Sequence, residues 1–339
     1  MSGRNRTFDR LRGIGAVCVV VLHAPPLYHS GVPALRAAGW LLREFSQSAV
    51  PYFFLLSGWI LGTKWAKGRT GWDEVVRSTG RILSLYLPWF AVFAAIDVAQ
   101  GLPHGWTVLA RRLVGFSDAT LDTRGYHLWF LPCLVLAQLA SWSLLKAFRS
   151  ALPAVLLGGC VYLALAGVDL AGGRLPWNLV PHEALDLSLV CTSLGLLMGL
   201  RAAAGKGRAA GPWIVALAAA LVAAESVATG LATGQILSIH AFQVTRVAFP
   251  AVVLLWAAGS PSAWGDGPVG RFLDLLGENS AGIYVSHLLF LTFIPFESLV
   301  PNGFVRDNLV RWPLVVACAL LLSWGLSRSR LSWIRGLVR

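Results

Sequence analysis

The sequence predicts an all-α, polytopic integral membrane protein with about ten transmembrane helices. Of its 339 residues, 56% are hydrophobic and 13% are charged, whereas an ordinary soluble domain has about 25% charged residues. So few charges cannot cover the surface of a globular protein of this length. Long apolar runs, separated by short joints that are polar or contain Pro or Gly, give the same indication segment by segment.

Apolar windows mark the expected helices, and each is about long enough to cross a bilayer. They lie near 12–28, 45–63, 82–100, 126–146, 151–168, 184–200, 212–233, 236–258, 272–296 and 308–327. If the N-terminus is cytoplasmic, most of the 28 Lys and Arg residues fall in cytoplasmic joints, as the positive-inside rule requires. We therefore expect both termini in the cytoplasm. We also expect one membrane domain over 1–339, with no appended soluble domain.

The net charge of +12 does not indicate a nucleic-acid partner. Lys and Arg are spread over the joints between apolar runs instead of gathering in one patch, so they report membrane topology. The five cysteines lie in or beside apolar segments and show no metal-ligand spacing. They are typical of small core residues, and no metal site is expected.

Ionisable residues within an apolar span indicate function, because burying them in lipid is costly. His23 lies in the first span, and Arg12 lies eleven positions before it. Eleven helical residues come within ~20° of three full turns and rise roughly 16 Å, so both side chains lie on one helix face. Arginine can bind phosphate or carboxylate, and histidine can act as a general base. The alternative is an arginine that reaches the interface beside a hydrogen-bonded interior histidine.

Arg77 and Arg81 are four positions apart where the third expected helix leaves the cytoplasm. They are therefore neighbours on one helix face. Two arginines in this position can bind an anionic headgroup of a substrate. Anchoring the helix to anionic lipid is the alternative, and it is the commoner reason for such a pair.

Two further groups of polar and aromatic residues lie at the fourth and ninth spans. His127 and Trp129 open the fourth span; aromatic residues there are typical of an interfacial belt, but a belt does not require the histidine. Ser280, Tyr284 and His287 follow an i, i+4, i+7 pattern, so they form one stripe that must face the protein interior. Contact between helices explains Ser280 but not the pair Tyr284 and His287.

Taken together, these segments resemble the membrane-bound acyltransferase 3 family of bacterial integral-membrane O-acyltransferases. The blocks that carry the resemblance occur in the family's order: Arg6-Thr-Phe-Asp9-Arg-Leu-Arg12-Gly13-Ile with His23, Ser48-Ala-Val-Pro51-Tyr-Phe53-Phe54-Leu-Leu-Ser57-Gly58, Arg81-Ile-Leu-Ser-Leu-Tyr86-Leu-Pro88, His127-Leu-Trp129-Phe130-Leu, and the segment with Tyr284 and His287. The resemblance covers most of the chain. Trp59 and Ser84 depart from the usual pattern, and neither bears on the chemistry below.

The resemblance implies transfer of an acyl group, often acetyl, from acyl-CoA to a hydroxyl. His23 would be the catalytic histidine, and Arg12 of the same catalytic motif would help hold the donor or the reacting groups. Arg77 and Arg81 would hold the acyl-CoA donor. We expect His127, Trp129, Tyr284 and His287 to bind the substrate. The acceptor would be a carbohydrate, a cell-surface glycan precursor or a small molecule, and the protein would reside in the bacterial cytoplasmic membrane with no permanently bound cofactor.

A membrane transporter or flippase is the rival class, because buried His and Arg residues can also form a substrate or proton path. The ordered motif blocks and the lack of a visible internal repeat favour the enzyme. Within the enzyme class, direct transfer to the acceptor and transfer through an acyl-enzyme both remain open.

Overall fold

The computed structural model describes residues 5–28, 30–100, 125–170, 182–233 and 243–338. Within these ranges every regular element is a helix and no strand occurs, which confirms the predicted all-α class. The chain forms two compact units. The first comprises residues 1–50, 209–240 and 248–339, and the second comprises 51–208 and 241–247.

Several helices have the length and composition of membrane spans. In the described ranges, five helices meet both criteria: Trp72–Ala99, Tyr126–Phe148, Asp186–Ala203, Pro212–Leu231 and Gly303–Ser327. Three shorter helices are also apolar: Leu152–Leu165, Thr245–Gly259 and Ser280–Phe293. They support the predicted membrane character. The ten crossings, the cytoplasmic termini and the single membrane domain stay predictions.

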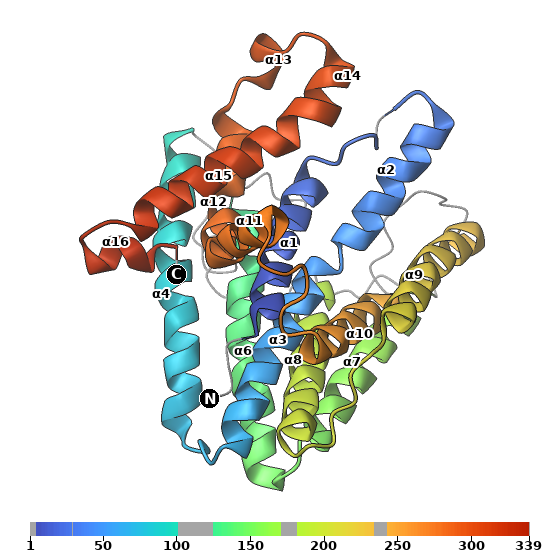
Figure 1. Cartoon of the computed structure of the whole chain (residues 1–339), viewed down its shortest axis with the longest axis vertical. Helices are drawn as coiled ribbons and strands as arrows, with labels where there is room; N and C mark the ends of the chain where they lie inside the picture. Colours follow the sequence, from blue (N-terminus) through green and yellow to red (C-terminus); the bar gives the residue numbers. More distant parts are fainter. Residues whose placement is uncertain (1–4, 29, 101–124, 171–181, 234–242, 339) are drawn as a thin grey trace. The chain divides into compact units, whose positions relative to one another are not determined.

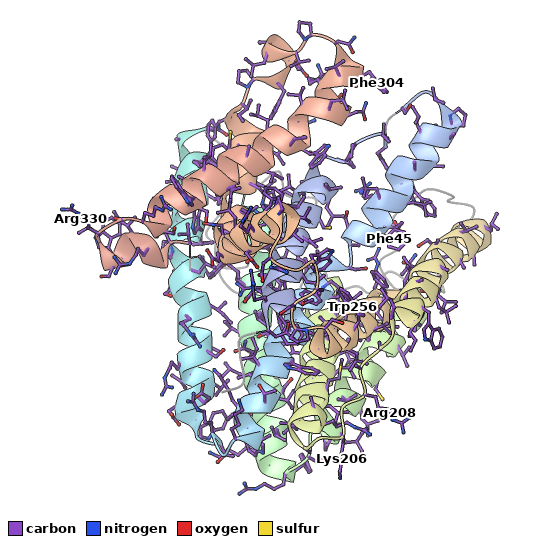
Figure 2. The ribbon with its side chains drawn as sticks, in the orientation of Figure 1. Phe45, Lys206, Arg208, Trp256, Phe304 and Arg330 are labelled. Atoms are coloured by element: carbon purple, nitrogen blue, oxygen red, sulfur yellow. The ribbon has the colours of Figure 1, made fainter. Side chains whose placement is uncertain are left out.

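The second unit is built mainly from long helices (Figure 1). They are α3 (Ala49–Ala66), α4 (Trp72–Ala99), α6 (Phe130–Phe148), α7 (Leu152–Leu170) and α8 (His182–Ala203), with the 3-10 turn η1 (Tyr126–Trp129) leading into α6. Helix α8 packs against α6 and α7, and α4 packs against α6. Lys206 and Arg208 are exposed in the joint that follows α8 (Figure 2).

Helices α3 and α8 approach closely through glycines that face each other's backbone. A Cβ atom added to Gly58 would lie 2.0 Å from the carbonyl oxygen of Thr192. One added to Gly195 would lie 2.0 Å from the carbonyl oxygen of Leu55. Such small residues allow membrane helices to pack backbone to backbone. Gly58, which ends the motif block that begins at Ser48, therefore has a packing role in this unit.

Replacing Gly58 with leucine should destabilise the protein, because the new side chain would overlap the backbone of α8. Overpacking typically costs about 1–3 kcal/mol, and backbone atoms cannot move aside as a flexible side chain can. Thermal unfolding in detergent, followed by tryptophan fluorescence, measures the effect. The control is Gly80→Leu, because a Cβ at Gly80 meets nothing within 4 Å. Equal melting temperatures for the two variants would contradict the packing role.

The first unit contains the two ends of the chain and the helices around them. Its main helices are α1 (Arg6–His23), α2 (Pro33–Ser46), α9 (Pro212–Thr233), α10 (Thr245–Gly259), α11 (Pro268–Glu278), α12 (Ser280–Phe293) and α15 (Arg311–Ser327). Short helices α13 (Phe296–Leu299), α14 (Gly303–Val305), η2 (Arg306–Val310) and α16 (Ser332–Gly336) complete it. Helix α1 packs against α11 and α12, and α12 packs against α15.

The first helix begins and ends at residues with clear physical reasons. The side chain of Asn5 accepts hydrogen bonds from the backbone N–H groups of Thr7 and Phe8, which caps the helix. At the other end α1 stops at His23, earlier than the predicted 28, because Pro25 and Pro26 follow and proline cannot continue a helix. His23 is therefore the last helical residue.

The range predicted as one helix, 272–296, contains two helices that meet at Asn279. This residue leaves helical geometry, with φ −104° and ψ 6°. Its side-chain Nδ2 donates to the carbonyl oxygen of Leu275 at 2.9 Å, and its Oδ1 accepts from Ser323 Oγ at 3.0 Å. Asparagine side chains compete with the backbone in this way, so the break follows from local hydrogen bonding that an apolar window does not detect.

Candidate active site

Two histidines from distant parts of the sequence stack against each other in the first unit. His23 ends α1 and His287 lies in α12; their ring centroids are 5.2 Å apart and their planes differ by 27°. The ring of Tyr284 lies 6.1 Å from that of His287. Three of the residues that the sequence singled out, His23, Tyr284 and His287, therefore lie together.

The hydrogen bonding of His287 fixes which ring nitrogen carries its proton. His287 is fully buried, and its Nδ1 lies 2.6 Å from the carbonyl oxygen of Tyr284. A carbonyl oxygen can only accept, so Nδ1 carries the hydrogen and donates it. In the neutral ring Nε2 is then the basic nitrogen. The pair thus combines a positioned imidazole with a second imidazole stacked on it.

Arg43 brings a positive charge to the same end of α1, and the sequence did not single it out as a site residue. Its guanidinium carbon lies 4.7 Å above the ring centroid of Tyr28, which follows α1 in the chain. His287 and Arg43 both interact electrostatically with His23. Among the described residues, the Nε atom of Arg43 is buried without a hydrogen-bond partner. The sequence feature that could have indicated Arg43 is its position on α2, an amphipathic helix.

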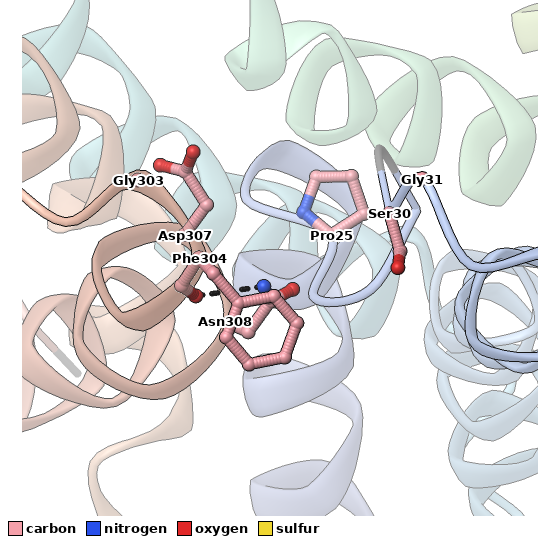
Figure 3. Close-up of a pocket in the computed structure, with 7 residues that line it drawn as sticks. All are labelled: Pro25, Ser30, Gly31, Gly303, Phe304, Asp307 and Asn308. Carbon is pink, nitrogen blue, oxygen red and sulfur yellow. Dashed lines mark hydrogen bonds between the residues drawn. The ribbon is translucent and has the colours of Figure 1, made fainter.

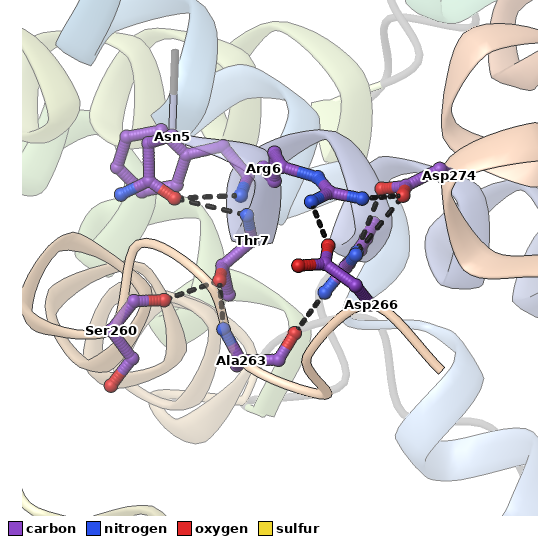
Figure 4. Close-up of polar contacts among 9 residues, drawn as sticks. Asn5, Arg6, Thr7, Ser260, Ala263, Asp266 and Asp274 are labelled. Carbon is purple, nitrogen blue, oxygen red and sulfur yellow. Dashed lines mark hydrogen bonds and ion pairs between the residues drawn. The ribbon is translucent and has the colours of Figure 1, made fainter. Parts of the chain in front are cut away.

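At the opposite end of α1, a network of polar contacts ties the helix to α11 and the loop before it (Figure 4). Arg10 is fully buried, and its guanidinium forms a two-pronged ion pair with Asp274, at 2.7 Å from Nε to Oδ1 and 3.0 Å from Nη2 to Oδ2. It also donates to the carbonyl oxygen of Ala263. Arg6 pairs with Asp266 and with Asp274.

This network has an electrostatic consequence for Asp274. Hydrogen bonds from Arg10 and then from Arg6 hold the pKa of the Asp274 carboxyl well below its usual range, against the opposing effect of desolvation. Arg10 and Arg6 therefore have a structural role as ion-pair partners of Asp274. The sequence reasoning did not identify this pairing, because its members lie at opposite ends of the chain.

Arg12, the predicted partner of His23, lies outside that network. It forms an ion pair with Asp9 at 3.3 Å, one turn earlier on α1, and its side chain is 38% exposed. An accessible arginine with one surface ion pair can be reached by an anionic ligand, since such pairs contribute only about 0–1 kcal/mol. The structure therefore places Arg12 on the same helix as His23, about three turns before the histidine pair.

In the second unit, Arg77 lies in an ion-pair network at the start of α4. It contacts Asp73 and Glu74, each at 3.3 Å. The Glu74 carboxylate is buried and also binds Lys64 at 2.6 Å. Arg81, one turn further along, is exposed. Arg77 thus has a structural role already, while a role of either residue in holding the donor stays a prediction.

His127 and Trp129, also in the second unit, belong to an aromatic cluster. His127 is buried in η1 and meets Phe93 edge to face at 5.2 Å. The ring of Trp129 lies 6.3 Å from that of Phe54, and Phe130 lies 4.8 Å from the same ring. Two of the motif blocks therefore pack on each other, which gives them a structural role; substrate binding by His127 and Trp129 stays a prediction.

Ser57, from the motif block on α3, also contributes a hydrogen bond to this packing. Gln138 of α6 donates through Nε2 to Ser57 Oγ at 2.5 Å.

Among the described residues, no group of three His, Cys, Asp or Glu side chains is placed to hold a metal ion.

Comparison with known proteins identifies one family and one partial relative. A family model described as an acyltransferase domain matches residues 5–328. An amino-acid racemase from Enterococcus faecalis is 26% identical over 144 residues, which cover 41% of this chain. The match spans 18% of the length of that racemase. No solved structure matches the chain.

Proposed function

The chain belongs to the acyltransferase 3 family, and from this premise we propose that it transfers an acyl group, acetyl in the first instance, from acyl-CoA to a hydroxyl. The acceptor is a carbohydrate, a cell-surface glycan precursor or a small molecule. The protein works in the bacterial cytoplasmic membrane. The observation that carries the proposal is the stacked pair of His23 and His287 at the end of α1.

In the proposed reaction, His23 is the general base. It takes the proton from the acceptor hydroxyl while the oxygen attacks the thioester carbonyl carbon. A carbon–oxygen bond forms, the carbon–sulfur bond breaks, and the CoA thiolate leaves with the proton that His23 had taken. The products are an ester and free CoA. A positioned base of this kind contributes about 10²–10⁴-fold to the rate.

His287 acts through His23 in this scheme. Its backbone hydrogen bond to Tyr284 fixes its ring in place, and its stacked ring restricts the orientation of His23. Holding a base in the reactive geometry is a recognised contribution to catalysis. We therefore assign His287 as a positioning residue.

The donor is proposed to approach from the other end of α1. Arg12 lies roughly 16 Å from His23 along the helix axis. If the CoA phosphates bind at Arg12, the pantetheine arm extends along α1 and brings the thioester to the histidine pair. The partial exposure of Arg12 supports this role, and guanidinium groups bind phosphates in a forked geometry. The role of Arg77 and Arg81 in holding the donor, expected from the sequence, is kept as part of the proposal.

Replacing Arg12 with alanine should raise the KM for acetyl-CoA by ~10-fold or more, the factor expected for loss of a charge-assisted hydrogen bond. The rate at saturating donor should change less, because Arg12 does not touch the reacting atoms. Initial rates of CoA thiol release at varied acetyl-CoA measure both quantities. Arg36→Ala, which removes an exposed arginine of α2, is the control. An unchanged KM in the Arg12 variant would show that the donor phosphates bind elsewhere.

A further inference from the structure

A cavity of about 230 Å³ lies beyond the His23 end of α1, within the first unit. Pro25 and Ser30 line it from the segment after α1, and Phe304, Asp307 and Asn308 line it from α14 and η2 (Figure 3). Phe304 is 52% exposed, so an aromatic ring is available at the cavity.

The walls of this cavity are held together by one side chain. Asn308 accepts a hydrogen bond through Oδ1 from the backbone N–H of Leu27 and donates through Nδ2 to the carbonyl oxygen of Phe304 at 2.7 Å. Leu27 has a φ of 63°, a left-handed conformation that is costly for a leucine. The opposite wall, Arg306–Val310, is a π-helix, a form often found at functional sites.

The groups that line the cavity suit a polyhydroxylated ligand. Arg306 orients Asp307 through both carboxylate oxygens, with Nε 3.0 Å from Oδ1 and Nη2 3.2 Å from Oδ2. A carboxylate has about four lone-pair positions in all, so it can accept from a ligand hydroxyl as well as from this arginine. The hydroxyl of Ser30 can donate or accept, and the ring of Phe304 offers an apolar face. The volume is below the ~300–1,000 Å³ typical of sites for drug-sized ligands, which suits a single sugar ring.

The position of the cavity relates it to the proposed reaction. Pro25 follows His23 by two residues, so their Cα atoms are at most ~7 Å apart. Arg12 lies about three turns before His23 on the same helix. The charged side chain that lines the cavity is the carboxylate of Asp307, and Arg306 and Arg311 lie 3.0 Å and 3.9 Å from its Oδ1. Because the donor phosphates are proposed to bind at Arg12, a cavity beyond His23 suits the second substrate.

We propose that this cavity binds the acceptor as a monosaccharide unit. Asp307 accepts hydrogen bonds from its hydroxyls and Phe304 packs on its apolar face, which presents one further hydroxyl toward His23. The role of the bound sugar as the acyl acceptor rests on the proposed acyltransferase function. The binding of a sugar in the cavity can be measured without that function.

The test uses two variants of the full chain in detergent, Asp307→Asn and Phe304→Ala. Phe293→Ala is the matched control, because Phe293 is also 52% exposed and does not line the cavity. Saturation-transfer NMR with a panel of methyl glycosides reports binding. Rates with acetyl-CoA and the best-bound glycoside report the KM of each substrate. Thermal unfolding shows whether each variant is folded.

Wild type and the Phe293 variant are expected to bind a glycoside, and both cavity variants to bind it ~10-fold or more weakly. The acceptor KM should rise by the same factor while the acetyl-CoA KM stays unchanged. Glycoside binding that is absent from wild type, or equal in the folded variants, would overturn the cavity assignment. Binding without any acyl transfer would overturn the proposed function and leave the sugar site standing.

Discussion

Replacing His23 with alanine is expected to lower the rate of acyl transfer by about 10²–10⁴-fold, the contribution of a general base. His23 is the last residue of α1 and stacks on His287. Its imidazole is proposed to take the proton of the acceptor hydroxyl. The measurement is the release of CoA thiol from acetyl-CoA, with and without acceptor. The KM for acetyl-CoA should be nearly unchanged, because the donor phosphates are proposed to bind at Arg12, about three helical turns from His23.

A control at the neighbouring position separates chemistry from packing. Leu22→Ala also removes side-chain volume from the last turn of α1, where Leu22 is partly buried, but it leaves both imidazoles in place. We expect this variant to remain active and to unfold at a temperature close to that of the His23 variant. Wild-type rates of acyl transfer in the His23→Ala protein would reject His23 as the base. Transport of the acceptor across the membrane without release of CoA would favour the rival transporter function.

The helices could be predicted from the sequence where a continuous apolar run sets them. The expected span 212–233 coincides with α9 (Pro212–Thr233), because a run of apolar residues follows a proline that is well placed at a helix start. Helix α2 (Pro33–Ser46) was missed, because its apolar residues form one face instead of a continuous run. Windowed hydrophobicity detects spans and overlooks amphipathic helices.

Part of the candidate site could also be predicted from periodicity. Ser280, Tyr284 and His287 were expected to face the interior, and all three are buried. Their meeting with His23 could not be derived, because it depends on how α1 packs against α12. The same limit applies to the arginines of α1. Arg10 can be buried because its charge is paired with Asp274. The two residues are 264 positions apart in the chain, and helical periodicity alone does not reveal such a partner.

Replacing Asp274, whose side chain is 24% exposed, with alanine is expected to destabilise the protein by up to about 3–5 kcal/mol, the effect of removing one partner of a buried ion pair. The change leaves the guanidinium of Arg10 fully buried with its carboxylate partner removed. Asp266→Ala is the matched control, because Asp266 pairs with Arg6 and is 82% exposed; exposed pairs contribute about 0–1 kcal/mol. Equal unfolding midpoints for the two variants would contradict the structural role of Arg10.

The same pair predicts a dependence of stability on pH. Because Arg10 and Arg6 lower the pKa of Asp274 in the folded protein, its carboxylate stabilises the fold fully above the unfolded pKa of about 3.9. That contribution is lost as the pH falls through the depressed pKa, so the stability difference between wild type and Asp274→Ala should shrink in acid. The double variant Arg10→Met with Asp274→Ala tests the cause of the destabilisation. It removes the uncompensated charge, and it should be more stable than Asp274→Ala alone. If Arg10 instead bound a substrate, the double variant would lose activity without regaining stability.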